Sequence, residues 1–124
     1  MAESQVSFGY VASPGVWEET SLTNVATQAK VGQSRVYNID IDNAAIAVSY
    51  VKVYYAAIGD VIVGTTAPDE IIPVPASTRL NHAIIQADDV KMNVGMVLAA
   101  VTTPGTGGVT PPASAVAVRV TMDM

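Results

Sequence analysis

The chain has 124 residues, the length of one domain, and a formal net charge of −5. Its six basic residues are scattered, which argues against the cationic stripe of a nucleic-acid-binding protein. No apolar run reaches the roughly 18 residues of a membrane-spanning helix, and the absence of cysteine excludes disulfides and thiolate metal sites. Valine and threonine are frequent while only 14% of residues are charged, so the composition favours β-sheet.

Residues 1–20 are predicted to form an extended arm or an irregular first strand. They contain three aromatic residues, Phe8, Tyr10 and Trp17, and the turn signal Pro14-Gly15. Their start lacks a basic region, so we expect no secretory signal. The aromatic side chains have two interpretations. They could pack back on the sheet and close the core, or they could anchor the chain in a neighbouring protein, because Trp and Tyr dominate interface hot spots.

Strand patterns recur from residue 21 onward. A strand is predicted over 22–31, ending at the turn 32–34. Residues 35–42 alternate with the period of two that is typical of a half-buried strand. That alternation divides the segment into two faces, Arg35, Tyr37, Ile39 and Ile41 against Val36, Asn38, Asp40 and Asp42. Residues 48–56 are apolar on both faces and are predicted to be a central strand, while 58–63 is ambiguous.

The second half of the chain continues this pattern. A short strand over 70–74 contains Pro73, which a sheet tolerates at an edge. A weaker strand follows at 80–86, and the apolar run 94–101 is predicted to be a buried strand rather than a helix. Residues 115–122 alternate again.

These signals predict an all-β fold with seven to eight short strands. The expected architecture is a single-domain antiparallel β-sandwich (jelly-roll or Ig-like) or a small β-barrel. The domain would span 21–124, with the arm at 1–20 and a long Gly/Pro/Thr loop at 103–113. Long loops are often contact elements.

Candidate chemical groups are few. His82 is the only histidine, and a structural role is expected for it. Asp40 with Asp42, and Asp88 with Asp89, could clamp a hard cation, although the first pair also fits a solvated strand face. The glycines at 105–108 lack the Lys-Ser/Thr of a phosphate-binding loop. We therefore expect no enzyme, cofactor or metal site.

Six blocks in chain order resemble a family of small virion proteins of tailed bacteriophages. The blocks are Lys30-Val31-Gly32-Gln33-Ser34-Arg35-Val36-Tyr37, Tyr50-Val51-Lys52-Val53-Tyr54, the Val-Gly-Thr-Thr-x-Pro-Asp block at 63–69, the Ile-Pro-Val-Pro-Ala block at 72–76, Leu98-Ala99-Ala100-Val101-Thr102-Thr103, and the Val-x-Val strand at 116–120. The block at 63–69 is the most specific of them. Between 80 and 95 the chain lacks the aromatic–glycine pair of the family pattern. The resemblance implies a structural protein on the outside of heads or tails and carries no catalytic residue.

The function that the resemblance implies is that of a capsid decoration, or cement, protein, which binds the outer surface of the capsid shell and stabilises it. Its partners would be the major capsid protein and other copies of itself, with a trimer favoured, and no nucleic acid or membrane. It would reside in the host cytoplasm before assembly and on the capsid exterior afterwards. The expected interface residues lie in the arm and the long loop: Phe8, Tyr10, Trp17, Thr103, Pro104, Pro111 and Pro112.

Two other functions fit the same sequence. The first is a structural component of a tail, neck or fibre. The second is a carbohydrate-binding β-sandwich module, which would use exposed aromatic side chains such as Tyr54, Tyr55 or Trp17 together with acidic residues around a calcium ion.

Overall fold

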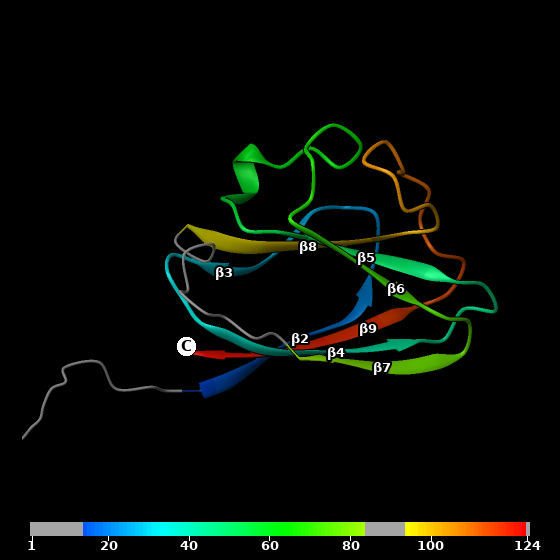
Figure 1. Ribbon diagram of the computed structural model, residues 1–124, viewed down its shortest axis with the longest axis horizontal. Coiled ribbons are helices and arrows are strands. Elements are labelled where there is room, and N and C mark those ends of the chain that lie inside the picture. Colours follow the sequence, from blue (N-terminus) through cyan, green and yellow to red (C-terminus); the bar gives the residue numbers. More distant parts are fainter. Residues whose placement is uncertain (1–13, 84–93, 124) are drawn as a thin grey trace, which may run out of the picture.

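The computed structural model describes residues 14–83 and 94–123. Within these ranges, two four-stranded antiparallel sheets lie face to face, which confirms the expected all-β fold (Figure 1). The first sheet has the order β2 (Pro14–Leu22), β9 (Val116–Asp123), β4 (Val36–Asn43) and β7 (Thr78–Ala83). The second has the order β3 (Thr27–Val31), β8 (Gly95–Val101), β5 (Ser49–Tyr54) and β6 (Glu70–Val74). A short 3-10 helix, η1, spans Ile58–Asp60.

The main core lies between the two sheets, where the inner faces of the strands meet. From β9 it takes every second residue, Val116, Val118, Val120 and Met122, all fully buried. Every residue of β8 is buried, and β8 is an interior strand of the second sheet. The strand predicted over 94–101 is therefore confirmed, and its continuous apolar run reflects burial on both faces of the sheet.

Proline placement agrees with the sheet order. β6 is the outer strand of the second sheet, and Pro73 lies within it, paired with Tyr50 of β5. An outer strand needs hydrogen bonds on one side only, so the missing N–H of proline costs little there. β5 itself lies between β8 and β6, which confirms the prediction of a central strand.

The alternation predicted for residues 35–42 is wrong at its start. Val36 and Ile39 are both fully buried, although strict alternation places them on opposite faces, while Tyr37 is exposed. The cause is a register shift against β9 between Val36 and Asn38. An extra residue at such a bulge reverses the side-chain alternation before it.

The strand predicted over 22–31 is in fact two strands in different sheets. β2 ends at Leu22 in the first sheet, and β3 begins at Thr27 in the second. Between them the Thr23 hydroxyl accepts a hydrogen bond from the Val25 amide at 3.2 Å. Such a local side-chain bond favours a turn over a continued strand.

The predicted boundary between arm and domain at residue 20 also needs correction. Residues 14–20 belong to β2, which pairs with β9 from Pro14 onward. Residues 14–20 are thus part of the sandwich, as the interpretation of this segment as a first strand predicts. Residues 1–13 lie outside the described residues.

Candidate functional site

Three loops cover the outer face of the second sheet, and we call them together the loop layer. They are residues 23–26, 55–69 and 102–115. Figure 1 shows the two longer loops above β5 and β8, on the side of the second sheet that faces away from the first. This surface contains the long Gly/Pro/Thr loop that the sequence singled out.

A second apolar cluster packs two of the three loops on the sheet. Its buried members are Tyr54, Val97 and Ala99 from the strands and Val61 from the loop 55–69. Three partly buried side chains of the loops or their ends pack against it, Ala26, Ala56 and Val63. The loop 55–69, and the loop 23–26 through Ala26, are therefore packed on the sheet by a small core of their own.

Lys52 of β5 binds the loop 102–115 from the sheet. Its side chain is fully buried under this loop, and its Nζ donates hydrogen bonds to the carbonyl oxygens of Thr106 at 3.2 Å and Gly108 at 2.9 Å. Burial lowers the pKa of the Lys52 ammonium, because desolvation disfavours the charged form. In the sequence Lys52 is one of six scattered basic residues and part of the block at 50–54, and no local pattern marks it as a loop anchor.

The three loops meet at Val109. Asn24 donates a side-chain hydrogen bond to the Val109 carbonyl at 2.8 Å. Gly64, which has a φ of +98°, lies so close that a Cβ there would be 2.5 Å from Val109 Cγ1. The positive φ favours glycine at position 64, and a side chain there would have to displace that of Val109. Val109 thus links the loops into one surface.

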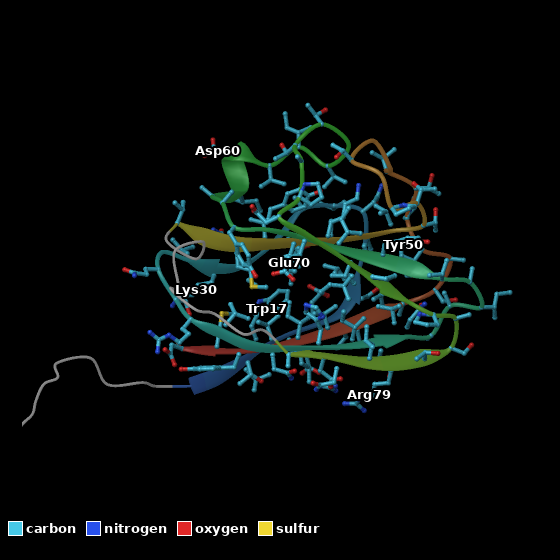
Figure 2. All side chains as sticks on the ribbon, viewed as in Figure 1. Trp17, Lys30, Tyr50, Asp60, Glu70 and Arg79 are labelled. Carbon is cyan, nitrogen blue, oxygen red and sulfur yellow. The ribbon has the colours of Figure 1, made fainter. Side chains whose placement is uncertain are left out.

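The loop layer exposes several large hydrophobic side chains and lacks basic groups. Four large hydrophobic side chains are exposed on it: Val25, Ile58, Ile62 and Val109. The three loops contain no Lys, Arg or His, and their two carboxylates are Asp60 and Asp69. Figure 2 shows Asp60 at the outer limit of this layer, far from Arg79 on the opposite side of the sandwich. Where such side chains are contiguous, they form the apolar patches that are typical of protein-contact sites.

The structure separates the interface residues that the sequence proposed. Thr103, Pro104 and Pro111 are exposed in the loop layer, and Pro112 is half-buried there. Trp17 lies in β2 of the first sheet, half-buried against the main core. The loop and Trp17 therefore do not form one surface. Phe8 and Tyr10 lie outside the described residues.

The aromatic platform expected for a carbohydrate-binding module is not formed by the two neighbouring tyrosines. Tyr54 is buried beneath the loop layer, and Tyr55 is half-buried. The Tyr55 hydroxyl donates a hydrogen bond to Glu70 at 2.8 Å. Burial, together with this bond, raises the pKa of Tyr55 above the usual range.

His82 takes part in a structural contact between the two sheets. Its Nε2 lies 3.1 Å from the second carboxylate oxygen of Glu70, the same side chain that binds Tyr55. Glu70 lies in β6 and His82 in β7, so the contact bridges the outer strands on one side of the sandwich. In the described part of the chain, no group of three or more acidic, His or Cys side chains is placed to hold a metal ion. Asp88 and Asp89 are not among the described residues.

The outer face of the first sheet carries a row of paired charges. Arg119 of β9 contacts Glu18 at 3.0 Å on one side and Asp40 at 3.7 Å on the other. Arg79 of β7 binds the same Asp40 carboxylate through two atoms, at 2.7 and 3.3 Å. The row crosses all four strands. Asp40 therefore lies on a solvated strand face. This is one of the two interpretations of Asp40 in the sequence, the other being a cation site.

This row gives a testable pH dependence. The hydrogen bond from Arg79 holds the pKa of Asp40 below its usual range. A carboxyl whose folded pKa is depressed stabilises the fold above its unfolded pKa of about 3.9, and loses that contribution as pH falls through the folded pKa. We expect Asp40→Asn to lower the free energy of unfolding by about 0.5–1 kcal/mol at pH 7, and by much less at pH 2.

Urea unfolding of both proteins at pH 7 and pH 2 measures this difference. Asp42→Asn, an exposed carboxylate on the same strand, is the matched control and should cost less. An equal loss for Asp40→Asn at both pH values would contradict the charge-based explanation.

Comparison with known proteins finds no relative of this chain. No family model, no curated protein and no solved structure matches the chain. Among the described residues, no helix has the length and hydropathy to cross a membrane. The candidate functional site is therefore identified from the geometry of the chain itself, as the loop layer over the second sheet.

Proposed function

We propose that the chain is a capsid decoration protein of a tailed bacteriophage and that the loop layer is the surface that docks on the outside of the assembled shell. The observation that carries the proposal is an ordered loop surface with exposed Val25, Ile58, Ile62 and Val109 and without a basic residue. A surface of this kind suits burial against protein. It offers nothing to the phosphates of a nucleic acid.

The mechanism would be mechanical. A protein that binds the assembled shell but not its broken state stabilises the shell by mass action. Many copies multiply a modest contact energy, and a trimer at a three-fold junction would add the effect of several linked contacts. The net charge of −5 would keep the free protein soluble before assembly.

The architecture supports a scaffold role for the sandwich and a contact role for the loops. Lys52, Asn24 and the second apolar cluster hold the loops before any partner is present. A surface that is already ordered loses little conformational entropy on binding. A rigid, repeated lattice such as the shell would also lose little conformational entropy on binding, so it is a suitable partner for this surface.

A pair of matched substitutions tests the docking surface. Ile62 is 63% exposed in the loop layer, and Ile46 is 90% exposed in the turn between β4 and β5. We expect Ile62→Glu to weaken binding to shells by about tenfold or more, because a charge would be desolvated in the interface. Ile46→Glu should bind like the natural chain.

The measurement is the occupancy of phage shells that have first been stripped of this protein, titrated with each purified variant. Circular dichroism and thermal unfolding of both variants provide the folding control. Equal binding by both variants would show that the loop layer is not part of the interface. Absence of binding by the natural chain, together with its detection on purified tails, would favour the tail, neck or fibre alternative.

A further inference from the structure

We infer that Lys52 is a positioning residue, which holds the tip of the loop 102–115 in the conformation that docks. This inference rests on the proposed function for its binding consequence. Its structural part concerns the free protein alone. Lys52 lies in the middle of β5, an interior strand of the second sheet.

Alternation along β5 directs Lys52 away from the main core. Its neighbours Val51 and Val53 belong to the core between the sheets, so Lys52 points to the outer face, where Tyr54 also lies in the second apolar cluster. On this face Lys52 is fully buried. A leucine or methionine would satisfy such a site by packing alone, so the ammonium group needs a separate explanation.

The ammonium group binds the tip of the loop from the sheet, beside two contacts from the loops themselves: the Gly108 amide donates to the Gly105 carbonyl at 3.0 Å, and Asn24 donates to the Val109 carbonyl. Thr106 and Gly108, whose carbonyls accept from Nζ, lie at the tip. A Cβ added at Gly105 or Gly107 would meet nothing within 4 Å, so these positions border open space. The base of the loop is held separately, by the Thr102 amide bond to the Thr110 carbonyl at 2.9 Å.

The glycines at the tip of the loop explain why an anchor would matter there. Residues 102–115 include three glycines, which gain much freedom when they are not held. Gly108 cannot carry a side chain here, because a Cβ would collide with Thr103. Gly108 is therefore needed for the loop to pack against Thr103, and a contact from the sheet helps to hold the flexible tip in one conformation. The two carbonyl bonds of Lys52 supply that contact.

Order in this loop determines the apparent affinity of the docking surface. When only a fraction of molecules holds the binding conformation, the apparent dissociation constant rises by the reciprocal of that fraction. A variant that keeps the loop ordered in a tenth of its molecules would bind about tenfold more weakly. Lys52 acts on binding in this way without touching the partner.

The test uses Lys52→Met, which keeps an apolar stem of similar length and removes the ammonium group. Lys30→Met is the matched control, because Lys30 pairs with Met96 at the start of β8, whereas the loop follows the end of β8. Figure 2 shows Lys30 at the opposite end of the sheet from this loop. Amide hydrogen exchange of the free proteins is followed at residues 102–110, with β8 as the internal reference.

In Lys52→Met we expect exchange across 102–110 to accelerate about tenfold or more, with β8 unchanged. We also expect shell binding to weaken about tenfold in the titration described above. Lys30→Met should leave both unchanged. Unaltered exchange in Lys52→Met would overturn the inference, and so would faster exchange with unchanged shell binding. Failure of the natural chain to bind shells would refute the proposed function, while the exchange result would still decide the anchoring role.

A chemical rescue separates the ammonium group from simple packing. The chain has no cysteine, so Lys52→Cys introduces a unique thiol. Alkylation with 2-bromoethylamine in denaturant displaces bromide by the thiolate and gives a thioether side chain that ends in an ammonium group, close to lysine in length. After refolding, slow exchange at 102–110 should return. An alkylated protein whose loop still exchanges rapidly would contradict the role of the ammonium group.

Discussion

Replacing Asn43 with alanine is expected to lower the free energy of unfolding by about 3 kcal/mol. The Asn43 side chain is fully buried at the end of β4. It joins two turns at one end of the sandwich. The two N–H groups of its Nδ2 are shared among the carbonyls of Ala47, Val74 and Pro75, and its Oδ1 accepts from the Ala45 amide and the Ser49 hydroxyl. Alanine would leave buried polar groups without partners, which costs more than the hydrogen bonds themselves contribute.

Urea unfolding monitored by tryptophan fluorescence measures this loss. Asn81→Ala is the matched control, because Asn81 is exposed on β7, and its free energy of unfolding should change by less than about 0.5 kcal/mol. Similar stabilities for the two alanine variants would show that Asn43 does not join the turns as described.

Leu98→Ala is expected to cost a comparable amount, about 3 kcal/mol, for a different reason. Leu98 is fully buried in the main core and lies between Thr27 of β3 and Val53 of β5 in the second sheet. Truncation removes apolar contacts and leaves a cavity that neighbouring strands cannot close. The free energies of unfolding of small domains are about 5–15 kcal/mol, so this single change removes a large share.

The control for Leu98 is Ile46→Ala, a truncation of a similar aliphatic side chain that is 90% exposed. Its free energy of unfolding should change by no more than about 0.5 kcal/mol. Thermal and urea unfolding of both variants give the comparison. A loss below about 1 kcal/mol for Leu98→Ala would mean that this side chain is not packed in the core as described.

The strands that could be predicted are those whose pattern is local. The run 94–101 has one chemical character throughout, and Pro73 restricts its strand to an outer position, so both followed from residue type alone. The alternation of β9 was equally direct, because its valines face the core at every second position. In each case the signal lies within the strand itself.

The features that could not be predicted depend on partners far away in sequence. The bulge in β4 is defined against β9, and the turn at 23–26 is needed because the chain crosses between sheets there. The site shows the same limit. Lys52 binds carbonyls more than fifty residues away, and Val109 links loops that no sequence pattern connects. The sequence predicted that the loop at 103–113 is a contact element. That this loop is held on the sheet could be seen only in the folded structure.

The pairing of β2 with β9 determines how the arm should be tested. Deleting residues 1–18 would remove the part of β2 that pairs with residues 119–123 of β9, as well as Phe8 and Tyr10. A truncation that ends at residue 13 leaves β2 whole. This truncation tests whether residues 1–13 anchor the chain on a partner, without removing a strand of the sandwich.

The most direct test of the proposed function is a cryo-EM map of the phage particle that carries this chain. We expect density for the sandwich on the outer capsid surface, with the loop layer facing the shell and the charged face of the first sheet, with Arg79 and Arg119, turned outward to solvent. Density on a tail or fibre, or a capsid-bound molecule whose loop layer faces solvent, would contradict the proposal.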